Sequence, residues 1–266
     1  SVIRAATGLH GLGATQLAAA YARAKLAAGW RLVAWVNGAD TVSLLTGLAA
    51  VADATGLADG DSGRGVVDAG AAVRDWLETD GDRCLLVLDD VSDPEAVRPF
   101  IPVGGTARVL ITSNRQSAAS LGSLVPVDMF SADEASAFLA ERTGWDDEAG
   151  AAAVAAALDH LPLALALAAS VMAGQQRIDY AWYLNRLQTV PVDAALAGDD
   201  GQPYPLGLAR TVLLSLQAVR AADRTGVCTR VMEIMSGLSA AGVHRGLLYS
   251  AGQAGVLASG GRLVAA

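Results

Sequence analysis

The sequence predicts an α/β fold: a parallel sheet with helices on both faces, followed by a helical region. Short apolar runs alternate with helix-like segments from residue 1 to about residue 130. These runs are continuously apolar, which is typical of strands that are buried on both faces of a parallel sheet. Beyond residue 130, helical spacing replaces the strand-like runs until the last residues of the chain.

The strands and helices of the first part are expected in alternation. Strand-like runs lie at 1–7, 31–36, 83–88, 108–111 and 125–127, and helical segments lie at 15–28, 42–54 and 66–78. The first helix follows a glycine-rich turn and is expected to end near Gly29, because glycine is a helix stop signal. Residues 59–65 read as a loop. This order predicts one sheet domain over residues 1–130.

The second part opens with a helix start. Ser131 is a good N-cap, and Glu134 stands at the capping-box position three residues later. Helices are expected at 135–143, 147–158, 163–173 and 179–189. We therefore predict a helical arm domain over residues 131–192.

A third part follows a Gly/Asp/Pro-rich linker at residues 193–205. Three helical segments are expected at 208–221, 225–238 and 244–253, and apolar Val256 and Leu257 are expected to begin a β-hairpin. Helices followed by a hairpin indicate a truncated winged-helix-like domain over residues 206–266. Since the chain begins at Ser1 without methionine, we expect it to be a fragment of a longer protein.

Composition excludes several classes of function. Among 266 residues, 19 Lys and Arg against 27 Asp and Glu give a net charge of −8, which disfavours nucleic acid and anionic membranes as partners. Cys84 and Cys228 cannot form a disulfide framework, so a cytoplasmic location is expected. The most apolar run, residues 161–174, is too short to span a bilayer.

The first motif is Gly8-Leu9-His10-Gly11-Leu12-Gly13-Ala14-Thr15. Its spacing is that of a phosphate-binding loop, G-x-x-x-x-G-K-[ST], in which backbone N–H groups and a helix N-terminus surround phosphate oxygens. Ala14 stands where that pattern has lysine. Taken alone, the residues are equally typical of an ordinary glycine-rich turn. A dinucleotide fingerprint is disfavoured, because Gln16 replaces its third glycine and Asn37 replaces the ribose-binding acid.

Polar residues follow two later strands. Asp89 and Asp90 end the run Leu85-Leu86-Val87-Leu88, and Thr112-Ser113-Asn114-Arg115 follow the next one. In a phosphate-loop protein, the first carboxylate would hold Mg²⁺ and the second would orient water. The alternatives are a solvated turn for the acids and an N-cap or turn cluster for the later residues. Pro162, in His160-Leu161-Pro162-Leu163, is typical of a helix start.

Together, these segments resemble the NB-ARC group of STAND signalling ATPases, which are P-loop NTPases. The likeness rests on GLHGLGATQLAAAYA, LLVLDDV, VLITSNR and HLPLALALAA, in that order. It is greatest for bacterial members that carry tetratricopeptide repeats. It covers residues 1 to about 190, and residues 206–266 look like the start of the family's winged-helix domain.

The resemblance implies a switch in which ADP holds a closed form and ATP opens it. Thr15 and Asp89 would hold Mg²⁺, and Asp90 would act on water. Thr112 with Asn114 or Arg115 would sense the γ-phosphate, although the family's arginine falls at the position of Asn114. Pro162 would lie near the adenine. The nucleotide would be bound by Gly8, His10, Gly11, Leu12, Gly13, Ala14, Thr15 and Gln16. The implied partners are other protomers, tetratricopeptide repeats or effector domains.

Ala14 is the sharpest departure from the family pattern. Losing a lysine contact to the phosphates costs about 1.5–3 kcal/mol, or about 10- to 150-fold in affinity. Turnover should fall further, because negative charge develops there in the transition state. We therefore expect an ADP/ATP-binding switch module with impaired hydrolysis. The alternatives are a pseudo-NTPase interaction scaffold and a winged-helix transcriptional regulator, of which the acidic charge disfavours the second.

Overall fold

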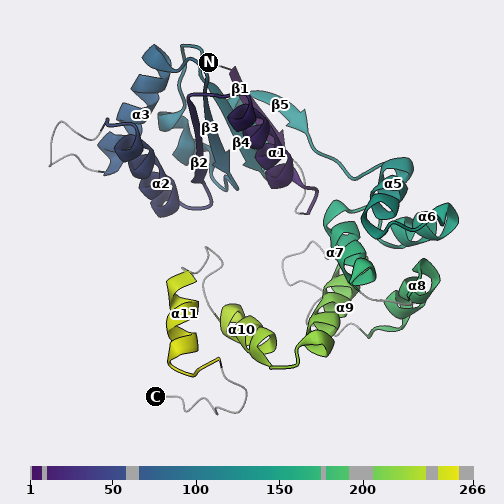
Figure 1. Cartoon of the computed structure of the whole chain (residues 1–266). Helices are drawn as coiled ribbons and strands as arrows, with labels where there is room; N and C mark the ends of the chain where they lie inside the picture. The colour runs from purple at the N-terminus through teal and green to yellow at the C-terminus, as the bar shows by residue number, and fades with distance from the viewer. Residues whose placement is uncertain are drawn as a thin grey trace. The chain divides into compact units, whose positions relative to one another are not determined.

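The structure is a computed structural model that describes residues 2–7, 11–57, 66–174, 178–191, 206–237 and 245–257. The chain divides into two compact units, Ser1–Asp128 and Met129–Ala266 (Figure 1). The loop predicted at 59–65 and the linker predicted at 193–205 lie outside the described residues.

The first unit contains a five-stranded parallel sheet with the order β2-β3-β4-β1-β5. The central strands are the most apolar, and Leu85, Leu86, Val87 and Leu88 are fully buried. The strands are β1 Val2–Thr7, β2 Leu32–Asn37, β3 Cys84–Asp89, β4 Arg108–Ser113 and β5 Ser123–Pro126. The parallel sheet predicted from the apolar runs is therefore confirmed.

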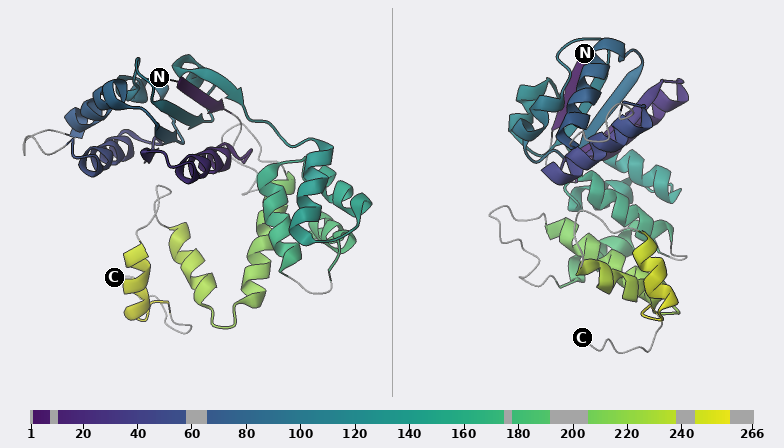
Figure 2. Two further views of the ribbon diagram at one scale, coloured as in Figure 1. Left: turned by 45° about the horizontal axis from the view of Figure 1, so that its top comes forward. Right: turned by 90° about the vertical axis from the view of Figure 1, so that its left-hand side faces the viewer.

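Helices lie against both faces of this sheet (Figures 1 and 2). On one face, Ala18 and Ala22 of α1 pack on Leu85 and Val87. On the other, α2 and α3 share a core with Leu86 and the alternate residues of β2 and β4. The helical segments of this unit are α1 Ala14–Ala27, α2 Thr41–Ala54, α3 Val66–Asp80, α4 Pro94–Val97 and the 3₁₀ turns η1 Arg98–Phe100 and η2 Gln116–Leu121.

The described part of the second unit is helical. Its α5 starts at the predicted capping box: Ser131 Oγ accepts the Glu134 N–H at 3.2 Å, and Glu134 Oε2 accepts the Ser131 N–H at 2.8 Å. The helices are α5 Ala132–Thr143, α6 Glu148–Ala157, α7 Pro162–Ala173, α8 Tyr180–Thr189, α9 Leu206–Ala222, α10 Val227–Ser236 and α11 Arg245–Gln253. Within the described residues, none is long and apolar enough to cross a membrane.

Small side chains let α7 pack closely with its neighbours. Ala164, Ala168 and Ala169 are buried, and α7 contacts both α5 and α9. Two tyrosines of α8, Tyr180 and Tyr183, are almost fully buried, and α8 contacts α6 and α9. The α9 helix also contacts α8, so it belongs to the same compact unit as the predicted arm.

The hairpin expected to begin at Val256 and Leu257 does not begin there. Both residues lie in the turn that ends α11, and the Val256 N–H donates to the Ala251 carbonyl at 2.9 Å. Gly255 adopts φ +75°, the left-handed conformation that commonly ends a helix, which explains the turn. Residues 258–266 lie outside the described residues, so the winged-helix prediction is untested there.

Candidate functional site

The strand register brings three of the sequence motifs to one edge of the sheet. The parallel strands β1, β2, β3 and β4 end in line there, with Thr7 beside Ser113 and Asn37 beside Asp89. The β3–β4 pairing, Leu88 beside Ile111, places Asp89 next to the following residue of β4, Thr112. Carboxyl ends of parallel strands are where α/β proteins bind ligands.

The α1 helix begins at the same edge with its N-terminus uncapped. Gly13, its N-cap residue, has φ +97° and ψ +16° and provides no side-chain cap. A Cβ on Gly13 would meet nothing within 4 Å, so the backbone angle alone favours glycine here. The first turn also carries no acidic residue. Among the described residues no side chain caps its first N–H groups, so these groups and the positive end of the helix dipole suit an anion.

One carboxylate oxygen links α1, β3 and β4. Thr15 Oγ1 donates to Asp89 Oδ1 at 2.9 Å, and Thr112 Oγ1 donates to the same oxygen at 2.5 Å. Thr112 Oγ1 also accepts the Asp90 N–H at 2.8 Å. The glycine-rich loop, the two acids and the polar end of β4, all separate in the sequence, therefore form one hydrogen-bonded group.

This geometry gives Thr112 a structural role that the sequence did not indicate. It is 2% exposed, and its one hydroxyl hydrogen goes to Asp89. A hydroxyl has a single donor, so the described arrangement makes Thr112 a positioning residue for that carboxylate. The family resemblance had suggested a phosphate-sensing role for it.

Asp90 occupies a conformation that few residues adopt. Its φ is +58°, in the left-handed region, where Asp and Asn are tolerated better than other non-glycine residues. Hydrogen bonds hold the backbone on either side: the Gly38 N–H donates to the Asp89 carbonyl at 2.6 Å, and the Val91 N–H donates to the Thr112 carbonyl at 2.9 Å. Such backbone strain is concentrated at functional sites. Asp90 itself is exposed to solvent.

The other predicted site residues fall in different places. Leu12 is buried in the first unit, whereas Gln16, Asn114 and Arg115 are exposed. Pro162 is the first residue of α7 in the second unit. Gly8 and His10 lie outside the described residues.

Ser113 is a residue whose contribution the sequence analysis did not assign. Its Oγ donates to the Val91 carbonyl at 2.6 Å and accepts the Arg115 N–H at 3.0 Å. It therefore fixes the backbone that carries Asn114 and Arg115. Its place in the polar stretch after an apolar run was the sequence signal for this.

The oxygen atoms at this edge suit a small, hard cation. Mg²⁺ prefers one or two carboxylate or hydroxyl ligands and completes its shell with water and phosphate oxygens. The Thr15 hydroxyl and the Asp89 carboxylate, 2.9 Å apart, supply such a pair. Within the described residues, no group of three His, Cys, Asp or Glu side chains could hold a metal by itself. Two ligands of this kind are what Mg²⁺ uses when water and phosphate oxygens complete its shell.

Comparison with known proteins finds no matching family model. A regulatory protein of Streptomyces griseus, AfsR, is 35% identical over 127 residues, which are 46% of this chain and 12% of that protein. The chain thus spans about an eighth of that relative's length.

Three solved structures are similar at low sequence identity. One is a Signal Transduction ATPase with Numerous Domains (STAND) protein with a tetratricopeptide repeat sensor from Pyrococcus horikoshii, with 18% identity, TM-score 0.47, and coverage of 72% of this chain and 30% of that chain. Cdc6p from Pyrobaculum aerophilum has 16% identity and TM-score 0.47, and the match covers 64% of this chain and 53% of that chain. ORC2 from Aeropyrum pernix, solved as ADPNP–ADP complexes, has 16% identity and TM-score 0.45. The match covers 70% of this chain and 60% of that chain.

Proposed function

We propose that this chain is the nucleotide-binding module of a STAND-type signalling ATPase that binds ADP or ATP with Mg²⁺. The observation that carries the proposal is the hydrogen-bonded group of Thr15, Asp89 and Thr112 beside the uncapped start of α1. A ligand that fits this edge carries negative charge, which interacts favourably with the N-terminus of α1. It also supplies further oxygen atoms that coordinate a cation held by Thr15 and Asp89. A magnesium–nucleotide has both.

The proposed roles follow from position. The backbone of Gly11 to Gln16 would surround the phosphates, and Thr15 with Asp89 would hold Mg²⁺, which supplies charge stabilisation when bound. Asp90 would orient the attacking water, and Asn114 or Arg115 would contact the terminal phosphate. Pro162 and the unlocated loop residues Gly8 and His10 keep the roles that the family resemblance implies. The arm at 131–192 and the winged-helix-like part at 206–266 would transmit the bound state.

Hydrolysis is proposed to be impaired. Ala14 is the first residue of α1, where the family pattern places its phosphate-binding lysine. The protein would therefore act as a cytoplasmic binding switch toward tetratricopeptide repeats, effector domains or other protomers. The name of the Streptomyces relative, a regulatory protein, supports a regulatory role. The same alanine favours a second candidate function, a pseudo-NTPase scaffold that binds no nucleotide.

Titration calorimetry with ADP and ATP, with and without Mg²⁺, separates the two functions. The switch predicts weak but measurable binding that Mg²⁺ strengthens. The absence of heat at millimolar nucleotide, with protein shown to be folded by circular dichroism, would favour the scaffold.

The two carboxylates should behave differently in an Ala14→Lys background. Asp89→Asn should weaken Mg²⁺-dependent binding, because the amide removes charge from the proposed cation site. Asp90→Asn should spare binding and remove turnover, because water orientation matters only in the chemical step. Binding constants and single-turnover rates measure the two effects. Equal losses of binding from both substitutions would make the pair structural and contradict the assigned roles.

A further inference from the structure

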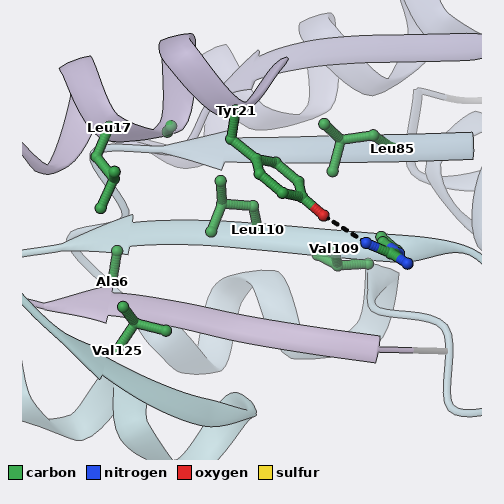
Figure 3. Close-up of a pocket in the computed structure, with 9 residues that line it drawn as sticks. Ala6, Leu17, Tyr21, Leu85, Val109, Leu110 and Val125 are labelled. Atoms are coloured by element: carbon green, nitrogen blue, oxygen red, sulfur yellow. Dashed lines mark hydrogen bonds between the residues drawn. The ribbon is translucent and has the colours of Figure 1, made fainter. Parts of the chain in front are cut away.

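A cavity lies on the face of the sheet that carries α1, beside that helix. Its volume is about 490 Å³, and its lining is largely apolar. Figure 3 shows Leu17 and Tyr21 of α1 on one side and Ala6, Leu110 and Val125 of three adjacent strands beneath. Leu17 is 50% exposed, so part of this apolar surface faces solvent.

The cavity exists because one helix is too narrow to cover this face. Strands lie about 4.8 Å apart, and a helix with its side chains is about 10 Å wide, so it covers about two strands. Among the described residues, α1 packs on β3 and on parts of β2 and β4. Beyond β4, Ala6 of β1 and Val125 of β5 continue the apolar floor of the cavity as a strip. Its width matches one further helix lying beside α1.

A pair of cations borders this strip at one end. Lys25 Nζ lies 4.7 Å from the Tyr21 ring centroid and 5.0 Å from the Trp30 ring centroid. The Arg108 guanidinium lies 5.1 Å from the Trp30 ring centroid and donates to Tyr21 Oη at 2.7 Å. Neither cation forms an ion pair with any described residue. The chain as a whole carries a charge of −8, so a cationic border marks this surface as complementary to an acidic partner.

We propose that this strip is the docking site for an amphipathic helix of a partner protein. The helix would place an apolar stripe over Leu17, Leu110 and Val125 and acidic side chains beside Lys25 and Arg108. Helix-in-groove recognition of this kind reads apolar residues at i, i+3, i+4 and i+7. The proposal is independent of nucleotide binding, because the strip contains none of the residues assigned to the nucleotide.

A labelled synthetic helix tests the proposal by fluorescence anisotropy. The probe carries leucines at i, i+3, i+4 and i+7 and glutamates at one end. It should bind the full chain, and Leu17→Asp should abolish binding because a carboxylate would enter the apolar contact. Leu26→Asp is the matched control: Leu26 is on the same helix and 58% exposed, but it does not line the cavity. This control should leave binding unchanged.

A charge swap tests the cationic border. Arg108→Glu should weaken binding of the acidic probe by up to about fivefold, and a probe with lysines in place of glutamates should recover that loss. Raising the salt concentration should weaken the original pair, because exposed charges are screened. Leu17→Ala, which keeps the helix propensity of α1, replaces Leu17→Asp if circular dichroism shows that the aspartate variant is unfolded.

Other occupants give distinct results. A chain that dimerises in sedimentation, with the dimer lost in Leu17→Asp, would assign the strip to a second copy. Binding to phosphatidylserine vesicles but not to the probe would assign it to a membrane. Either result would overturn the proposal. It would also be overturned if Leu26→Asp lost as much probe binding as Leu17→Asp, or if the unmodified chain did not bind the acidic probe.

Discussion

The helices α1 and α5 begin in opposite ways. At α5, Ser131 and Glu134 satisfy each other's backbone N–H groups, and two acidic residues lie in the first turn. At α1, the N-cap is a left-handed glycine, no side chain caps the first turn, and that turn contains no acidic residue. Aspartates cap α2, α6 and α8 in the manner of α5. Side chains of the chain itself cap those helix starts, whereas no described side chain caps the start of α1.

The largest expected effect comes from adding the missing cation to α1. Ala14→Lys should tighten ADP or ATP binding by about 10- to 150-fold. Without nucleotide, the same lysine should lower stability by about 0.3–1 kcal/mol, because it lies at the positive end of the helix dipole. Calorimetry and thermal melting measure the two quantities. Unchanged affinity would mean that α1 does not start at a phosphate site.

Alanine substitutions at two glycines test the difference between the two helices. Gly13 at the start of α1 and Gly144 at the end of α5 have φ +97° and +72°, and a Cβ on either would meet nothing within 4 Å. Alanine at either position should therefore cost a similar conformational strain, about 1–2 kcal/mol in urea unfolding.

Only one of these substitutions should affect the ligand. Gly13→Ala should weaken nucleotide binding by displacing the N–H groups of the first turn, and Gly144→Ala should leave it unchanged. If both variants bind nucleotide equally well, the special role given to the start of α1 is wrong.

The smallest expected effect tests the capped helix. Ser131→Ala should destabilise the protein by about 1 kcal/mol in urea unfolding without changing nucleotide affinity.

The partner of Ser131 in this cap gives a pH-dependent prediction. The hydrogen bond from the Ser131 N–H, and secondly the one from the Ser131 side chain, lower the pKa of Glu134. A lowered pKa contributes stability above the unfolded value of about 4.3 that is lost as pH falls through the folded value. In urea unfolding between pH 7 and pH 3, the free energy of unfolding of Glu134→Gln should therefore depend less on pH than that of the unmodified protein.

Features set by local pattern were predictable from the sequence. The run Leu85 to Leu88 indicated a fully buried strand, and Ser131 with Glu134 indicated a capped helix; the structure confirms both. The phosphate-loop spacing and the acids after β3 also pointed to one edge of the sheet. These properties depend on residues that are close in sequence, so one chain is enough to recognise them.

Features set by distant contacts were not predictable. Nothing local shows that β4 lies between β3 and β1, and that order is what brings Thr112 to Asp89. Without it, Thr112 could be interpreted only through the family resemblance. The left-handed backbone of Asp90 likewise depends on hydrogen bonds from two neighbouring strands.

The strand order also affects how the sheet can be assembled as the chain is made. The first strand to be synthesised, β1, pairs only with β4 and β5, which come about a hundred residues later. At translation rates of about 5–20 residues per second, β1 waits about 5–20 s for its neighbours. Meanwhile β2 and β3 can pair with each other. The link between Thr112 and Asp89 therefore cannot form before β4 has been synthesised, and until then the unpaired edge of β1 is exposed to aggregation.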